Sequence, residues 1–234
     1  MPFTFGEDGT RIHYDVWGKA DGEPLLMIQG LGADRRGWIL QRRAFGAKYR
    51  CIALDNRGVG KSDAPPGPYD LSMMARDAMA VLDDVGVDRA HVMGASMGGV
   101  ISQIVGVLHA DRVRSLTLAC TACRQLPWRR ELLAEWAALA EVEGMGAFVQ
   151  RNARWLFGAR SFRRLQPLIG PVGGLALNSS PHSFIAQVDA ILAADESLRE
   201  ELHRVAAPTL ILVGSQDILT PRGDSEELLS LIPG

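Results

Sequence analysis

The feature that most constrains the fold is a serine between a strand-like run and a helix-like segment. The residues from His91 to Gly99 read HVMGASMGG, with Ser96 at the centre of a G-x-S-x-G spacing. A serine in this context sits on a sharp turn where neighbouring backbone comes close, so small residues are needed on both sides. Gly94 and Gly98 meet this need. The pattern therefore predicts a buried strand that ends at an exposed serine.

Strand-like and helix-like segments alternate through the first half of the chain. The run at 24–30 is continuously apolar, which is typical of a strand buried on both faces. Residues 49–54 repeat that pattern, and residues 113–120 form another predicted strand. Between them, residues 71–85 have helical apolar spacing, and Gly86 follows as a stop. This alternation predicts an α/β fold with a mostly parallel sheet and helices on both faces.

The pattern changes after residue 120. Residues 129–144 and 180–195 have apolar side chains at helical spacing, and Ser180 and Pro181 form a cap and first helical residue. A strand signal returns only at PTLILVG, which begins at Pro208. We therefore expect a first core part at 1–120, a helical cap at 121–206 and a second core part at 207–234.

Three motifs together resemble the α/β-hydrolase family. They are DNRGVGKSDAPPGPYDL, GASMGG and PTLILVGSQDILTP, and the resemblance covers nearly the whole chain. They are most similar to the branch that holds 3-oxoadipate enol-lactonases, small esterases and cofactor-free haloperoxidases. The resemblance implies a mainly parallel sheet with a helical cap after the sixth strand. In the first motif, Arg57 and Asp63 are interpreted as scaffold residues that pin the turn by hydrogen bonds.

The same resemblance suggests roles for individual residues. Ser96 is the expected nucleophile, and the N–H of Met97, at the start of the next helix, is expected to bind an oxyanion. The loop Gln29-Gly30-Leu31-Gly32 is expected to supply a second donor, the N–H of Leu31, while Gln29 orders the loop. Asp217 follows a buried strand and is the candidate acid that orients a histidine. An ordinary turn aspartate is the alternative interpretation of Asp217.

The family pattern also requires a histidine after Asp217, and residues 218–234 contain none. Among the five histidines, His182 in the predicted cap is the best substitute, although a surface position is the simpler interpretation. Three explanations remain open. The chain is part of a longer enzyme, it is a hydrolase-like scaffold without its base, or another chain supplies the histidine. The first is favoured, because the last predicted strand would otherwise be an unpaired apolar edge.

Other ligand motifs are incomplete. GVGKS lacks the first glycine of a phosphate loop, because position 55 is Asp55. GLGADR has Arg35 where a dinucleotide turn has its third glycine. Cys120 and Cys123 form one C-x-x-C pair, whereas a zinc site needs about four ligands. We therefore expect no metal and no organic cofactor.

Net charge and composition limit the classes of binding partner that the sequence predicts. The net charge of −2 gives no reason to expect nucleic acid or an anionic membrane, and no apolar stretch is long enough to span a bilayer. Three cysteines and no signal-peptide pattern favour a cytoplasmic protein. A homodimer through the apolar sheet edge is a further expectation.

The functional prediction is a serine hydrolase that cleaves a small carboxylic ester or a lactone. Two alternatives stay open: a non-catalytic ligand-binding scaffold on a hydrolase frame, and a cofactor-free haloperoxidase-like enzyme. The position of a histidine relative to Ser96 separates the first alternative from the enzyme.

Overall fold

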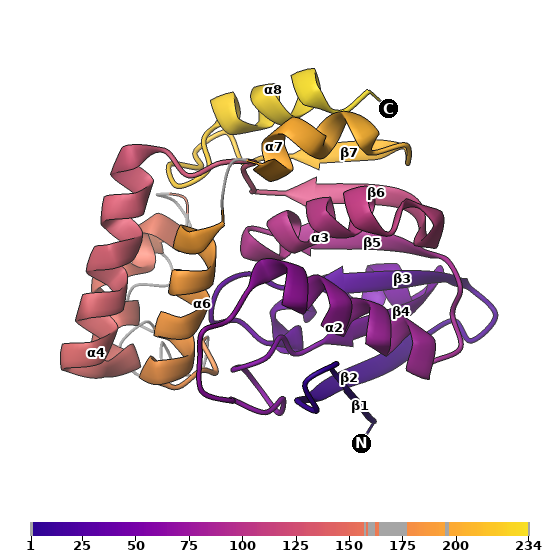
Figure 1. Cartoon of the computed structure of the whole chain (residues 1–234), viewed down its shortest axis with the longest axis horizontal. Helices are drawn as coiled ribbons and strands as arrows, with labels where there is room; N and C mark the ends of the chain where they lie inside the picture. The colour runs from indigo at the N-terminus through magenta and orange to yellow at the C-terminus, as the bar shows by residue number, and fades with distance from the viewer. Residues whose placement is uncertain (1, 157, 159–161, 164–176, 195–196, 234) are drawn as a thin grey trace.

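A twisted sheet of seven strands forms the centre of the molecule (Figure 1). The computed structural model describes residues 2–156, 158, 162–163, 177–194 and 197–233. The strand order is β1-β2-β4-β3-β5-β6-β7. The pairs β1–β2 and β2–β4 are antiparallel, and the pairs β4–β3, β3–β5, β5–β6 and β6–β7 are parallel. The strands are β1 (Phe3–Phe5), β2 (Arg11–Gly18), β3 (Glu23–Ile28), β4 (Tyr49–Leu54), β5 (Ala90–Ala95), β6 (Val113–Ala119) and β7 (Thr209–Leu212). The predicted mostly parallel sheet is confirmed.

Both faces of the sheet are covered. In β3, Leu26 and Ile28 join the core beneath α2 (Leu71–Asp84) and α3 (Met97–Leu108). Leu25 and Met27 join a smaller core on the other face, with residues of η1 (Arg35–Trp38) and α1 (Arg42–Gly46). Side chains alternate along a strand, so a continuous apolar run is stable only when both faces are buried. The predicted helices on both faces are therefore confirmed.

Local signals set the ends of α2. The carboxylate of Asp70 accepts from the N–H groups of Ser72 and Met73, at 2.6 and 3.0 Å. Such a cap satisfies donors that have no partner inside the helix. Gly86 follows with φ of 65°, as the predicted stop requires. A helix with defined ends then packs its apolar face on the sheet.

The turn between β5 and α3 is as tight as predicted. Ser96 has φ of 53° and ψ of −120°, a strained conformation for a residue with a side chain. A methyl group on Gly94 would lie 2.1 Å from the carbonyl oxygen of Gly98. A methyl group on Gly98 would lie 2.2 Å from the carbonyl oxygen of Ile28. Larger residues would push the backbone apart, which confirms the need for glycine at both positions.

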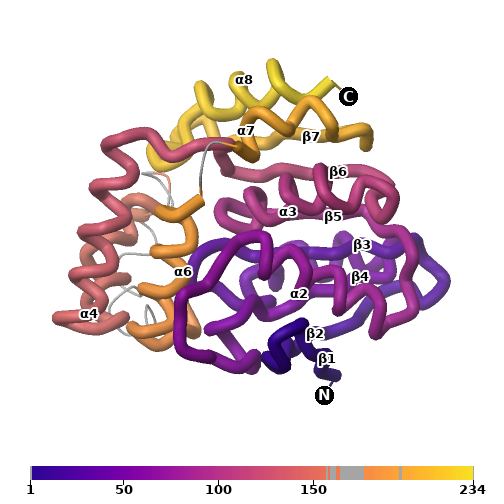
Figure 2. The backbone as a smooth tube through the Cα atoms, in the orientation of Figure 1, coloured from indigo at the N-terminus to yellow at the C-terminus, as the bar shows by residue number. Residues whose placement is uncertain are grey.

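Two long helices form a separate layer beside the carboxyl ends of the parallel strands (Figures 1 and 2). They are α4 (Pro127–Leu156) and α6 (Pro181–Ala193), which pack against each other. The helix α4 is kinked at Gly144, where φ is 81°. Ser180 caps α6 and Pro181 is its first residue, as predicted. We call this pair of helices the cap.

The chain returns to the core through short helices. These are α7 (Ser197–Glu201) and η3 (Leu202–Arg204), and both contact α3. Although the predicted cap range 121–206 includes them, they pack beside the sheet (Figure 2). The remaining helices are η2 (Ala110–Arg112) and α8 (Arg222–Leu231). None of the helices in the described part of the chain is long and apolar enough to cross a membrane.

The strand β7 lies at the edge of the described sheet, next to β6. Its Leu210 and Leu212 are 54% and 42% exposed. An exposed apolar edge strand can pair with an edge strand of a second chain, and this is the reason for the predicted homodimer. The homodimer itself stays a prediction.

The DNRG loop is scaffold, as interpreted from the sequence, but its contacts reach further than one turn. Arg57 is buried, and its guanidinium bonds Asp77 of α2 and Asp8 of the β1–β2 turn, each at 2.8 Å. Asp63 pairs instead with Arg11 of β2. The loop therefore joins the first two strands to α2.

Candidate functional site

A largely apolar cavity of about 300 Å³ lies between the cap and the carboxyl ends of the strands. Ligand pockets are typically of this size or larger, with few polar groups. The core contributes Ser96 and its neighbours, and the cap contributes aromatic and aliphatic side chains. The lining residues include Leu31, Met97, Val100, Leu133, Trp136, Phe148, Leu156, Leu177, Phe184, Ile191 and Leu219.

Ser96 lines this cavity at the junction of β5 and α3. Its N–H donates to Ala119 of β6 at 2.9 Å, and its carbonyl oxygen accepts from Gly99 at 2.8 Å. The hydroxyl of Thr121 also donates to that carbonyl, at 2.8 Å. The backbone of the serine is thus held from β6 as well as from its own helix. Met97 follows as the first residue of α3, where an N–H has no acceptor inside the helix.

The loop after β3 faces Ser96 across the cavity. The side-chain oxygen of Gln29 accepts from the N–H of Gly30 at 3.2 Å, so Gln29 orders the loop as predicted. The N–H of Gly32 donates to Gln187 at 2.9 Å, and the N–H of Ala33 donates to the carbonyl of Gly30 at 3.2 Å. In the described part of the chain, the N–H of Leu31 has no such acceptor. This leaves Leu31 as the donor that the loop can offer to a ligand.

Asp217 lies in a neighbouring hollow of about 330 Å³, not in the cavity of Ser96. Leu156 lines both spaces. The Asp217 carboxylate accepts from the N–H groups of Leu219 and Thr220, at 3.0 and 2.8 Å, and from the hydroxyl of Thr220. These bonds are those of a turn aspartate. Thr220, which donates two of these bonds to Asp217, also lines the serine cavity.

None of the five histidines lines the serine cavity, and all five lie in the described residues. His13 is buried against Asp55, with its Nδ1 at 3.1 Å from the carboxylate. His91 contacts Ser115 and Glu23 at the far end of β5. His182 is exposed on α6, which agrees with the simpler interpretation of a surface position. No histidine of residues 1–234 therefore acts as base for Ser96 in this arrangement.

Among the described lining residues of the cavity, the charged side chain is that of Arg129, and it is neutralised within the protein. Arg129 lines the wall but is only 3% exposed. Its guanidinium donates to the carbonyls of Leu219 and Arg124, at 2.9 and 3.1 Å, and pairs with the buried Asp224. Its donors therefore tie the start of α4 to the residues around α8. They are not directed to a ligand.

Burial disfavours the thiolate form of the C-x-x-C pair. Cys120 and Cys123 are both free thiols. Burial raises the pKa of the Cys123 thiol to about 11, and burial followed by the Asp217 charge raises the pKa of Cys120. A raised pKa lowers the fraction of thiolate, which is the form that redox and metal chemistry need. Within the described residues, no three His, Cys, Asp or Glu side chains are grouped for a metal ion.

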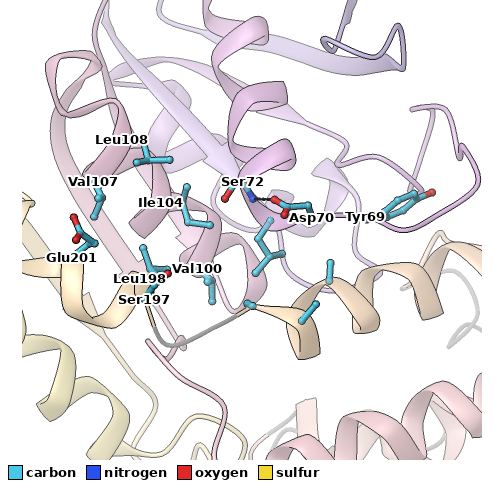
Figure 3. Close-up of a pocket in the computed structure, with 14 residues that line it drawn as sticks. Tyr69, Asp70, Ser72, Val100, Ile104, Val107, Leu108, Ser197, Leu198 and Glu201 are labelled. Atoms are coloured by element: carbon cyan, nitrogen blue, oxygen red, sulfur yellow. Dashed lines mark hydrogen bonds between the residues drawn. The ribbon is translucent and has the colours of Figure 1, made fainter.

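A second surface hollow of about 330 Å³ lies between α2, α3, α6 and α7 (Figure 3). Val100 lines both this hollow and the serine cavity, so it is part of the wall between them. The polar residues here are Asp70, which caps α2, with Ser72, Ser197 and Glu201. Among its described lining residues, neither Ser72 nor Ser197 has the strained backbone of Ser96, so we take the cavity of Ser96 as the candidate site.

Two residues that support the site were missed from the sequence. Gln187 of α6 is fully buried and bonds the loop after β3. It lies three residues after Phe184 and one before Val188, so a polar residue on the apolar face of the helix was the available signal. Thr121, which bonds the carbonyl of Ser96, follows the last strand before the cap and gave no distinct signal.

Comparison with known proteins agrees with the observed fold. The family model described as "alpha/beta hydrolase fold" matches residues 23–234. The protein named "Putative carbamate hydrolase RutD" of Azorhizobium caulinodans is 29% identical, and the match covers 100% of this chain and 87% of the relative. The 3-oxoadipate enol-lactonase 2 of Acinetobacter baylyi is 27% identical, with 96% and 83% covered. The crystal structure of the enol-lactonase from Burkholderia xenovorans LB400 superposes with a TM-score of 0.90 at 29% identity, covering 100% of this chain and 88% of that chain.

Proposed function

Because the chain belongs to the α/β-hydrolase fold family, we propose that it is a serine hydrolase that cleaves a carboxylic ester or a lactone. The observation that carries the proposal is the strained backbone of Ser96, which holds the residue at the head of α3 on the wall of an apolar cavity. Strain at one residue persists only where the surrounding structure enforces it, and it is concentrated at functional sites.

In the proposed reaction, the hydroxyl oxygen of Ser96 attacks the carbonyl carbon and its proton passes to a base. The carbonyl oxygen becomes an oxyanion, which the N–H groups of Met97 and Leu31 bind, together with the positive end of α3. The C–O bond to the leaving group breaks as the base returns the proton to it. Water then attacks the acyl-serine by the same route and releases the acid.

The base in this scheme is an imidazole that binds beside Asp217, because none of the five histidines of residues 1–234 lines the serine cavity. The hollow beside Asp217 supports this part of the proposal, because it adjoins the serine cavity at Leu156 and has room for an imidazole. Asp217 would orient that ring and stabilise its cation. The residues that hold Asp217, chiefly Thr220, keep the carboxylate at this position.

The proposed substrate has an uncharged acyl group. Apolar side chains from both the core and the cap line the cavity, and the donors of Arg129 are bound within the protein. A carboxylate on the acyl chain would be desolvated there without a free cation among the described lining residues. Hydrolysis of p-nitrophenyl butyrate should therefore exceed that of a p-nitrophenyl ester with a terminal carboxylate and equal chain length.

The test of the enzyme is chemical rescue with imidazole. The protein of residues 1–234 is assayed on p-nitrophenyl butyrate over increasing imidazole concentration, and its reaction with a serine-reactive fluorophosphonate is followed by mass spectrometry. We expect imidazole to raise both rates until they saturate, because free imidazole can act as the base beside Asp217. The fluorophosphonate adduct should map to Ser96.

Two variants control for the reaction of free imidazole with the ester. Ser96→Ala should reduce the rate to that of imidazole alone. Asp217→Asn should keep the fold but raise the imidazole concentration needed for half-saturation, because the ring loses its orienting carboxylate. If Ser96→Ala hydrolyses the ester as fast as the unchanged protein and no adduct forms, the non-catalytic scaffold is the better description.

A further inference from the structure

The cap and the loop after β3 are joined through one buried side chain. Gln187 lies in the middle of α6 and is fully buried. Its oxygen accepts from the backbone N–H of Gly32 at 2.9 Å, and its nitrogen donates to the backbone carbonyl of Arg57 at 2.8 Å. A backbone N–H can only donate and a carbonyl can only accept, so the two partners define the orientation of the amide.

The first of these bonds acts on the loop that faces Ser96. Gly32 directly follows Leu31, whose N–H is the proposed oxyanion donor, and it has φ of 69°. When the Leu31–Gly32 peptide is held by Gln187, rotation about the backbone of Leu31 is restricted. On the other side of Leu31, Gln29 holds the N–H of Gly30 at 3.2 Å. The donor thus lies between two peptide groups, each anchored by a glutamine.

The rest of α6 and the segment before it also contact this loop. A methyl group on Gly32 would lie 3.1 Å from the ring of Phe184, so the ring packs directly on the loop. The amide of Asn178 donates to Asp34 of this loop at 3.1 Å, and the carbonyl of Asn178 accepts from Gly60 of the DNRG loop at 2.8 Å. The helix α6 and the segment before it therefore contact the loop at several points. Among these contacts, the Gln187 bond reaches the peptide next to the donor.

We propose that Gln187 is a positioning residue that couples the place of the cap to the geometry of the oxyanion donor. This inference rests on the proposed function of Ser96 and Leu31. A cap that shifts away from the core would release Gly32 and loosen the donor, so the site is complete only when α6 is seated. Substrate contacts with cap residues then favour the arrangement that binds the oxyanion.

The experiment compares Gln187→Met, which keeps the side-chain length without either hydrogen bond, with Gln187→Glu, which keeps an oxygen acceptor for Gly32. Ser183→Ala is the matched control, because it removes a polar group of α6 that bonds Ser180 and does not contact the loop. The first measurement is amide hydrogen exchange of peptides that cover residues 29–34. The second is the rate of fluorophosphonate reaction at Ser96, and the third is the kcat and KM for p-nitrophenyl butyrate. The second and third are made with saturating imidazole.

We expect Gln187→Met to speed exchange in residues 29–34 and to lower kcat and the labelling rate about tenfold or more, with KM little changed. Gln187→Glu should recover most of both effects, and Ser183→Ala should change neither. Exchange that stays as slow in Gln187→Met as in the unchanged protein would overturn the coupling. Faster exchange with an unchanged kcat would overturn the positioning role. The exchange measurement does not depend on catalysis, so it tests the coupling even if Ser96 proves inert and the proposed function fails.

Discussion

Gly30 and Ser96 lie next to each other on the wall of the serine cavity. A methyl group on Gly30 would lie 3.1 Å from the Cβ of Ser96 and 3.6 Å from its hydroxyl oxygen. It would also lie 3.1 Å from the carbonyl oxygen of Ala95. The loop and the serine turn are therefore in close contact here, and a side chain at position 30 would press on Ser96.

The first prediction follows from that spacing. Gly30→Ala should lower kcat for p-nitrophenyl butyrate, measured with imidazole, by about tenfold to a hundredfold, because the loop must retreat and carry the N–H of Leu31 with it. The free energy of unfolding should fall much less. Gly146→Ala is the matched control, since a methyl group there meets nothing within 4 Å. Equal kcat values for the two variants would contradict the assigned role of the loop.

The second prediction concerns the turn around Ser96. Gly98→Ala should lower the free energy of unfolding by about 3 kcal/mol or more, because the new methyl group overlaps the carbonyl of Ile28 in β3. Urea unfolding followed by circular dichroism measures the change. Gly223→Ala, at an open position of α8, should leave stability equal or slightly higher. A loss of the same size in both variants would mean that the turn is not crowded.

The third prediction tests the buried ion pair that joins the DNRG loop to α2. Arg57→Met leaves the buried Asp77 without its partner and should cost about 3 to 5 kcal/mol of unfolding free energy. Arg57→Met combined with Asp77→Leu should cost clearly less, because no unpaired charge remains buried. Arg222→Met breaks an exposed pair with Glu226 and should change stability by no more than about 1 kcal/mol. A double variant as unstable as Arg57→Met would refute the charge argument.

The fourth prediction concerns alkaline stability. Burial, reinforced by the hydrogen bond to Asp84, raises the pKa of Tyr14 to about 12. An unfolded tyrosine ionises near pH 10. The folded phenol therefore contributes stability that is fully present below about pH 10 and is lost as the pH rises towards 12. In urea titrations from pH 8 to 11.5, the stability difference between the unchanged protein and Tyr14→Phe should shrink above pH 10. A constant difference would contradict the shifted pKa.

Much of the fold follows from short stretches of sequence. The glycines at 94 and 98 predict a tight turn around Ser96, and apolar periodicity predicts the strands, the helix at 71–85 and the two cap helices. Each of these features depends on residues close together in the chain, whose spacing decides which side chains share a face. That is why the Ser180 cap and the Gly86 stop were predicted at the residues where the structure has them.

The tertiary structure decided how those elements meet. Periodicity identified the buried face of α6, but only the docked cap shows that Gln187 of that face bonds Gly32, 155 residues away. Likewise, the resemblance named Asp217 and Ser96 together, whereas the fold puts them in adjoining hollows with Leu156 between them. A hydrogen bond or a shared cavity between distant segments depends on where whole helices and loops come to rest. The spacing of residues within one segment does not specify that placement, because the same apolar face can pack against many different partners.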